Sequence, residues 1–181
     1  GNKIPDLERR QEKDVLAHQP NVVVIYIGIN DVWHSLRDRG TSKEDFQQGL
    51  ARIIAQCEAQ GARVILCTAS VIGEKTDGSN QLDAMLDEYC DLSRQVAKEK
   101  QLQLLDLRKA FLAHLKQHNA DNAEKNVLTT DGVHLNEAGN RFVADQMLAA
   151  LGVQSGSDRV LRHVVLFKFK PDVTQQQIDE V

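Results

Sequence analysis

The pattern of apolar and polar positions along the chain alternates between the period of a helix and that of a buried strand. Apolar side chains recur every three to four residues over residues 46–57 and 82–96, which places them on one face of a helix. Continuous apolar runs at residues 22–27 and 64–67 are typical of strands, and the first fits a central strand covered on both faces. Because the two kinds of segment alternate over short connections, the sequence predicts an α/β domain with a parallel sheet.

Local signals refine the boundaries of these elements. Thr41 with Glu44, or Ser42 with Asp45, has the spacing of a capping box for the helix that Gly61 ends. The other elements are expected, in chain order, at these positions: helix 4–16, strand 63–71, loop 73–80, helix 82–96, strand 102–107, short helix 110–115 and helix 136–152.

Composition and charge exclude several classes of protein. The chain has 181 residues, 41% hydrophobic and 27% charged, which is ordinary for one globular domain with a small appendage. A net charge of −4 gives no basic footprint for nucleic acid. The longest apolar run, residues 22–29, is far shorter than the roughly 18 residues of a membrane span. The chain does not start with methionine and shows no signal peptide, so the sequence predicts no localisation.

Two short motifs, far apart in the sequence, carry candidate chemistry. Asp131 lies three residues before His134 on a turn with Gly132, so its carboxylate can orient an imidazole that deprotonates a serine hydroxyl. Asn30 follows the first strand, at the end where parallel sheets bind ligands, and its amide can donate a hydrogen bond to an oxyanion. Taken alone, each motif is also compatible with an ordinary polar turn.

The longer strings around these residues are more specific. Residues 129–140, Thr-Thr-Asp-Gly-Val-His-Leu-Asn-Glu-Ala-Gly-Asn, and residues 28–31, Gly-Ile-Asn-Asp, resemble two of the four signature blocks of the SGNH (GDSL-type) hydrolases. The resemblance covers residues 1–153 and implies a three-layer α/β/α, flavodoxin-like fold with a parallel sheet.

The resemblance also implies roles for individual residues. Asp131 and His134 match the aspartate and histidine of the catalytic triad, and Asn30 matches the asparagine of the oxyanion hole. Residues 1–7 look like a third block joined in mid-motif, which makes Gly1 a second oxyanion donor through its backbone N–H. Trp33 and His34, which follow Asn30, are expected to line the acyl pocket.

The family's nucleophile block, Gly-Asp-Ser, is absent. None of the seven serines lies in such a block or in a Gly-x-Ser-x-Gly elbow, and Ser79, in Asp-Gly-Ser, is expected in a solvated loop. In the family the serine follows a first, central strand. Since a βαβ unit takes roughly 30 residues, we expect about that many, with this N-terminal strand, to be missing before Gly1. The chain as printed is therefore expected to be inactive or nearly so. A truncated reading frame and a pseudo-enzyme without a serine both remain open.

The C-terminal end differs from the rest of the chain. Residues 154–158 are expected to form a short linker. Residues 159–181 resemble the beginning of a stress-responsive A/B barrel (Dabb) domain, an α+β, ferredoxin-like unit that is truncated here. That resemblance implies a homodimer through the complete Dabb domain.

The resemblances together imply a carboxylic-ester hydrolase of the GDSL esterase or lipase type, acting through a Ser-His-Asp acyl-enzyme. The implied substrate is a small ester, such as an acetylated carbohydrate or a short acyl ester. No cofactor or metal is implied, and Cys57, Cys67 and Cys90, without a CxxC spacing, are expected to be buried free thiols. The alternative is a catalytically inactive SGNH-like binding or scaffold module. An unrelated flavodoxin-like domain is disfavoured because no phosphate-binding glycine loop follows any strand.

Overall fold

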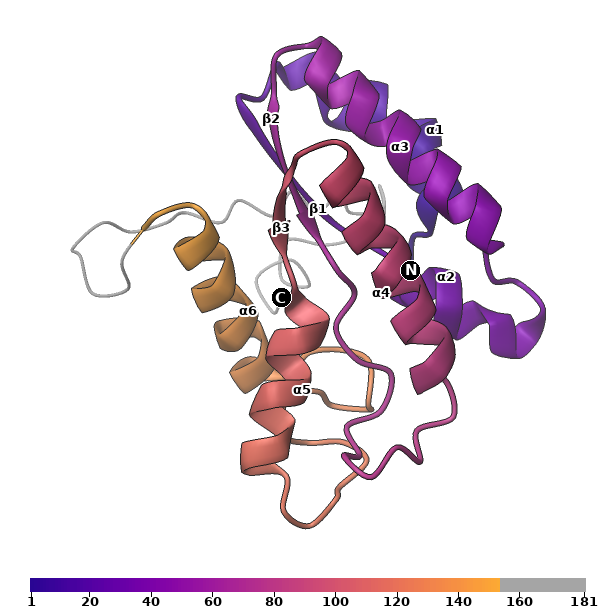
Figure 1. The fold of residues 1–181 in the computed structure, drawn as a ribbon, viewed down its shortest axis with the longest axis vertical. Helices are drawn as coiled ribbons and strands as arrows, with labels where there is room; N and C mark the ends of the chain where they lie inside the picture. Colours follow the sequence, from indigo (N-terminus) through magenta and orange to yellow (C-terminus); the bar gives the residue numbers. More distant parts are fainter. Residues whose placement is uncertain (154–181) are drawn as a thin grey trace, which may run out of the picture.

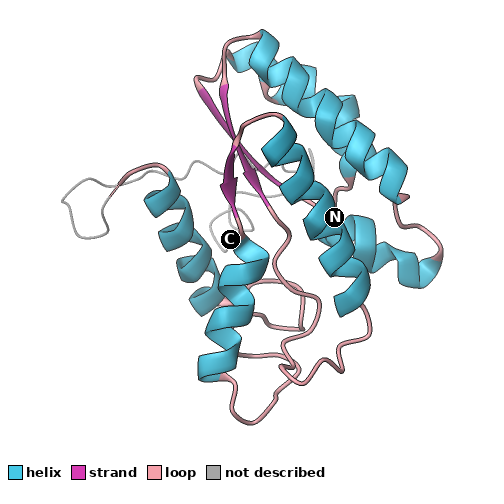
Figure 2. Cartoon of the chain, viewed as in Figure 1, coloured by secondary structure: helices cyan, strands magenta, loops and turns pink. Residues whose placement is uncertain are grey.

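The structure, a computed structural model, describes residues 1–153. A three-stranded parallel sheet lies in the middle of the molecule, with the strand order β1 (Val22–Tyr26), β2 (Arg63–Cys67) and β3 (Gln103–Leu105) (Figure 1). At the carboxyl end of the first pair, Tyr26 lies opposite Cys67. Helices follow the strands in alternation (Figure 2), so the predicted α/β class with a parallel sheet is confirmed.

Helices cover the sheet from both sides. They are α1 (Ile4–Asp14), α2 (Ile29–Trp33), α3 (Lys43–Ala59), α4 (Asp83–Glu99), α5 (Leu107–His118) and α6 (Glu137–Ala150), with short 3-10 turns η1 (Leu16–His18) and η2 (His34–Arg37). Side chains of α1, α3 and α4 form one hydrophobic cluster with the sheet, and those of α5 and α6 form another. The two clusters lie on opposite faces of the sheet, which gives three layers (Figure 1).

β1 lies at an edge of the sheet that the described residues form. It pairs with β2 alone, and Val22 and Val24 are 39% and 36% exposed. Successive side chains of a strand point to opposite faces, so Ile25 is buried with α1 and α3 while Val22 and Val24 point away from them. On that second face the cluster under α5 and α6 includes only Tyr26 from β1. Within residues 1–153, β1 is therefore covered on one face and partly open on the other, whereas the apolar run alone predicts cover on both.

Side-chain caps fix the start of three of the α-helices in residues 1–153, which are α3, α5 and α6. Ser42 caps α3, because its hydroxyl accepts the N–H of Asp45 at 3.1 Å. α5 begins earlier than predicted because Asp106 caps it, accepting the N–H of Lys109 at 3.0 Å. α2 was not predicted, since five residues are too few to show a helical period.

Residues 154–181 lie outside the described residues. The predicted linker at 154–158 and the Dabb-like, ferredoxin-like segment at 159–181 therefore stay predictions. Within residues 1–153, no helix combines the length and apolar character needed to cross a membrane.

Candidate active site

Asp131 and His134 meet in the loop that joins α5 to α6. Nδ1 of His134 lies 2.8 Å from Oδ2 of Asp131, and the side chains are 66% and 48% exposed. The other carboxylate oxygen, Oδ1, accepts the backbone N–H groups of Val133 and His134 at 3.0 and 2.8 Å. The aspartate and histidine that the sequence singled out are thus in direct hydrogen-bond contact, with the carboxylate held on both oxygens.

These hydrogen bonds change the acidity of the carboxyl group. The backbone N–H of His134, followed by its imidazole, lowers the pKa of Asp131 from 3.8 to about 2. An ionised carboxylate at Nδ1 keeps the proton on that nitrogen and leaves Nε2 as the basic nitrogen of the neutral ring. Among the described residues, no side chain or backbone group is hydrogen-bonded to Nε2 of His134.

The loop around this pair is closed by short-range backbone contacts. Thr129 and Leu135 form an isolated antiparallel bridge, and the N–H of Thr130 donates to the carbonyl of His134 at 2.8 Å. Gly132 has φ +93°, in the left-handed region that favours glycine, and its N–H donates to Oγ1 of Thr129. The turn that presents Asp131 therefore depends on a glycine at its centre.

The first turn of α6 packs against the same loop. Asn136 caps the helix by accepting the N–H of Gly139 at 2.9 Å, and its own N–H donates to the carbonyl of Leu128 at 3.0 Å. A side chain on Gly139 would overlap that carbonyl oxygen. The helix therefore packs on the loop at backbone contact distance, which only glycine permits.

Asn30 and Gly1 lie side by side. Asn30 is on the first turn of α2, two residues after Gly28 and just beyond the carboxyl end of β1. Its Nδ2 donates to the carbonyl of Asn2 at 3.0 Å, and a Cβ on Gly1 would overlap the same nitrogen. The two residues predicted to bind an oxyanion are thus adjacent, although one is at the start of the chain and the other follows a strand.

Asp31 holds this pair together, a function that the sequence analysis missed. Its fully buried carboxylate accepts the N–H of Ile4 at 3.0 Å, at the start of α1. Its backbone carbonyl accepts the N–H of Thr41. Burial raises the pKa of Asp31, and the hydrogen bond from the N–H of Ile4 opposes that shift. Asp31 therefore ties the start of α1 to α2. In the sequence, only its place in the Gly-Ile-Asn-Asp block points to it.

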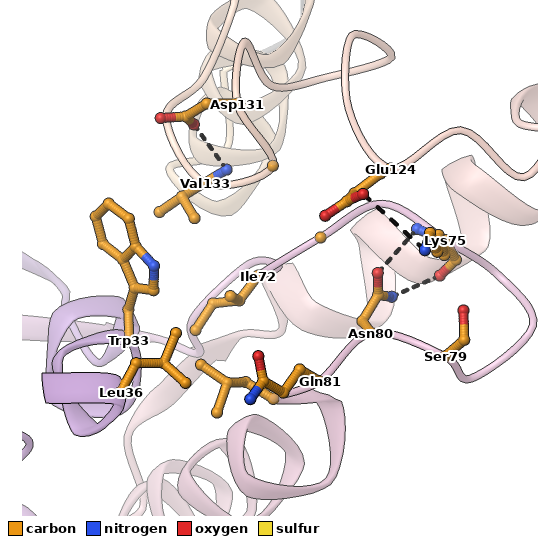
Figure 3. A pocket seen from close by; sticks show the side chains of 13 residues that line it. Trp33, Leu36, Ile72, Lys75, Ser79, Asn80, Gln81, Glu124, Asp131 and Val133 are labelled. Carbon is orange, nitrogen blue, oxygen red and sulfur yellow. Dashed lines mark hydrogen bonds and ion pairs between the residues drawn. The ribbon is translucent and has the colours of Figure 1, made fainter.

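Trp33 connects α2 to the loop that carries Asp131 and His134. Its ring lies edge-on to that of His134, with centroids 5.6 Å apart and planes at 78°. A cavity of about 260 Å³ lies beside Trp33 and Asp131 (Figure 3). Its lining includes Trp33, Leu36 and Ile72 on the apolar side, the loop residues Asp131, Gly132 and Val133, and the polar Lys75, Ser79, Asn80, Gln81 and Glu124. Of the two predicted pocket residues, Trp33 lines this cavity and His34 does not.

The remaining candidate groups are Ser79, the three cysteines and the side chains of types that bind metals. Ser79 lies in an exposed loop, as expected, and has no hydrogen bond to His134 among the described residues. The three cysteines are buried and free, as predicted. In the part of the chain that the structure describes, no three His, Cys, Asp or Glu side chains gather in a way that could hold a metal ion.

Known proteins resemble the chain in sequence. The acetylxylan esterase of Geobacillus stearothermophilus is 28% identical over 162 residues, which cover 85% of this chain and 69% of that protein. An acetylxylan esterase of Xylanibacter ruminicola is 27% identical over 166 residues, which cover 81% of this chain and 32% of that longer protein.

Solved structures resemble the chain in fold. The crystal structure of the acetyl xylan esterase AlAXEase superposes with a TM-score of 0.82 at 44% identity, covering 83% of this chain and 76% of that one. Axe2, an acetylxylan esterase from Geobacillus stearothermophilus, superposes with a TM-score of 0.74 at 26% identity, covering 84% and 69%. The family model described as GDSL-like lipase/acylhydrolase matches residues 1–142. The chain therefore belongs to the GDSL-like lipase/acylhydrolase family.

Proposed function

We propose that the protein hydrolyses carboxylic esters through a Ser-His-Asp acyl-enzyme, with Asp131 and His134 as two members of the triad. The hydrogen bond between Asp131 and Nδ1 of His134 carries this proposal, because it leaves Nε2 as the base. The third member is a serine that lies before Gly1 in the full-length protein, since no Gly-Asp-Ser block occurs in this chain.

The proposed reaction uses each group at a defined step. Nε2 of His134 accepts the proton of the serine hydroxyl as its oxygen attacks the ester carbonyl. Nδ2 of Asn30 and the backbone N–H of Gly1 then donate to the oxyanion, and one such donor contributes roughly 3–4 kcal/mol. The imidazolium returns its proton to the departing alcohol, which leaves an acyl-serine. Water deprotonated by His134 attacks this ester and releases the acid.

Relatives of this chain support the two catalytic assignments. Structures of Axe2 include catalytic mutants in which a serine, an aspartate or a histidine is replaced by alanine. The replaced aspartate and histidine of Axe2 are three positions apart, the spacing of Asp131 and His134 in this chain.

We further propose that the ester is an acetyl group on a carbohydrate. The relatives named above are acetylxylan esterases. The cavity beside Asp131 combines the indole of Trp33 with the polar side chains of Lys75, Gln81 and Glu124 (Figure 3). An aromatic face bordered by polar groups suits a leaving group rich in hydroxyls.

Acetate release from acetylated xylo-oligosaccharides by the full-length protein tests this function. Replacing the base in His134→Ala should lower kcat by roughly 10³-fold or more. His18→Ala serves as the control, because His18 is an exposed histidine on η1. If the unaltered protein hydrolyses the ester and the His134→Ala variant hydrolyses it equally well, the assignment of His134 is refuted. If the unaltered full-length protein does not hydrolyse the ester, the function is refuted.

A further inference from the structure

A second acid, Glu74, is buried against the loop that carries Asp131 and His134. Its side chain is fully buried in the short segment after β2, where residues 69–72 are buried as well. A buried carboxylate is costly unless hydrogen bonds compensate for the lost water. No ion pair involving Glu74 is formed within residues 1–153, and its neighbour Lys75 instead pairs with Glu124 at 4.0 Å.

Two backbone donors of the catalytic loop satisfy this carboxylate. Oε2 of Glu74 accepts the N–H of Val127 at 2.8 Å, and Oε1 accepts the N–H of Leu128 at 2.7 Å. Leu128 is the residue whose carbonyl receives the N–H of Asn136 and contacts Gly139 at the start of α6. Next to it, Thr129 forms the bridge that closes the loop around Asp131. The carboxylate thus holds the base of the loop.

The backbone on both sides of Glu74 is fixed to the same loop. The N–H of Gly73 donates to the carbonyl of Gly132 at 2.7 Å, in the turn between Asp131 and His134. The N–H of Glu74 donates to the carbonyl of Glu124, and its carbonyl accepts Nδ2 of Asn119 at 2.7 Å. Residues 73 and 74 therefore contact the loop both at residues 124–128 and at Gly132.

The chemistry of the contact requires a carboxylate. Two adjacent N–H groups need two acceptor oxygens, and a carboxylate supplies both. A glutamine of the same shape supplies one oxygen and turns an NH₂ donor toward the second N–H. Hydrogen bonds from backbone N–H groups to an ionised carboxylate are also stronger than those to a neutral amide.

We propose that Glu74 is a positioning residue for the reaction, which keeps the Asp131–His134 pair in its catalytic geometry by holding the loop at Val127 and Leu128. This inference rests on the proposed function, in which His134 is the base. It assigns Glu74 no contact with the substrate. Its effect reaches the reaction through the hydrogen bond at Nδ1 of His134.

Glu74→Gln in the full-length protein tests the inference with two readouts. Ring ¹⁵N shifts of His134 report whether the proton is on Nδ1, and we expect a population with the proton on Nε2 to rise as the contact with Asp131 loosens. With an acetylated substrate we expect kcat to fall about 10²-fold with little change in KM, since small displacements of catalytic groups have effects of that size.

Asp106→Asn is the matched control, because it makes the same change of carboxylate to amide in another structural contact. Asp106 caps α5 and pairs with Arg94 at 2.9 Å, with no contact to the catalytic loop among the described residues. We expect the control to keep the His134 tautomer and a kcat within about twofold. If Glu74→Gln does not fold, Glu74→Asp, which keeps the charge but shortens its reach, takes its place.

The outcomes separate this inference from the proposed function. A folded Glu74→Gln protein with the tautomer and kcat of Asp106→Asn would overturn the positioning role. An unaltered protein without ester hydrolysis would overturn the function, while the tautomer comparison would still report whether Glu74 positions His134.

Discussion

Asp131 shows how much of the site is determined by a single turn. Its carboxylate receives two backbone N–H groups and one imidazole, all from the three residues that follow it. Taken alone, Asp131 and His134 are also compatible with an ordinary polar turn, and only the longer string at residues 129–140 makes this pair a specific prediction. The locality of the contacts explains why the pair is well formed although both side chains are substantially exposed.

The ionisation of Asp131 gives a prediction at this scale. Its pKa is lowered to about 2 in the folded protein, below its ordinary value of 3.8. The stabilisation from this group is therefore fully present above about pH 4 and is lost as the pH falls through about 2. The ¹³C shift of the carboxyl carbon, followed from pH 6 to pH 1.5, should give a midpoint near 2.

His134→Ala provides the control for that titration. The variant removes the imidazole but keeps the backbone N–H of residue 134, which is the largest cause of the shift. The pKa of Asp131 should therefore rise but stay below 3.8. A midpoint near 3.8 in the unaltered protein would show that the turn does not form as described.

At the scale of elements, helix ends follow from the sequence better than strand environments do. Ser42 and Asn136 cap α3 and α6 at the positions where the sequence predicts those helices to begin, since a cap acts within three residues. β1 forms where expected but lies at an edge of the described sheet, because pairing depends on residues far away in the chain. α2 escaped prediction because its stability comes from the buried Asp31 and Val32 rather than from a repeating pattern.

The junction of α6 with the loop that carries Asp131 and His134 gives a second prediction. Gly139→Ala would raise the stability of an ordinary helix by roughly 1 kcal/mol. Here its Cβ would overlap the carbonyl oxygen of Leu128, so we expect the free energy of unfolding in urea to fall by about 1–3 kcal/mol.

Asn140→Ala, at the next and exposed position of α6, is the control and should change the free energy of unfolding by less than about 0.5 kcal/mol. A stabilised Gly139→Ala protein would show that α6 does not approach the loop this closely.

At the scale of the whole molecule, the outer edge of β1 is partly apolar and pairs with no other strand of residues 1–153. Val22 and Val24 are exposed, and a second cavity, of about 270 Å³, lies between this strand and α1. Exposed strand edges pair with other chains, and a charged side chain suppresses such pairing.

We therefore expect the chain of residues 1–181 to self-associate and Val24→Lys to reduce that association, measured by sedimentation velocity over a range of concentrations. Leu112→Lys is the control, because Leu112 is a similarly exposed apolar residue, 38% accessible, on α5. Equal effects of the two variants would assign the association to general hydrophobicity rather than to the edge of β1.

The parts of the site that escaped prediction are those assembled over long distances. The motifs in the sequence are enough to single out the local pair of Asp131 and His134, and also Asn30. The contacts of Glu74 with Val127 and Leu128 span 53 and 54 residues, and a single acid in the segment after a strand gives no sequence signal that would reveal them. Only the fold places residues 73 and 74 beside the catalytic loop.

The most direct test of the central claim is covalent labelling of the full-length native protein with a fluorophosphonate, which reacts with an activated serine. Peptide mass spectrometry should find one labelled serine, in a Gly-Asp-Ser block before Gly1, and His134→Ala should abolish the label. A label on one of the serines of this chain, or a label that persists in His134→Ala, would contradict the account.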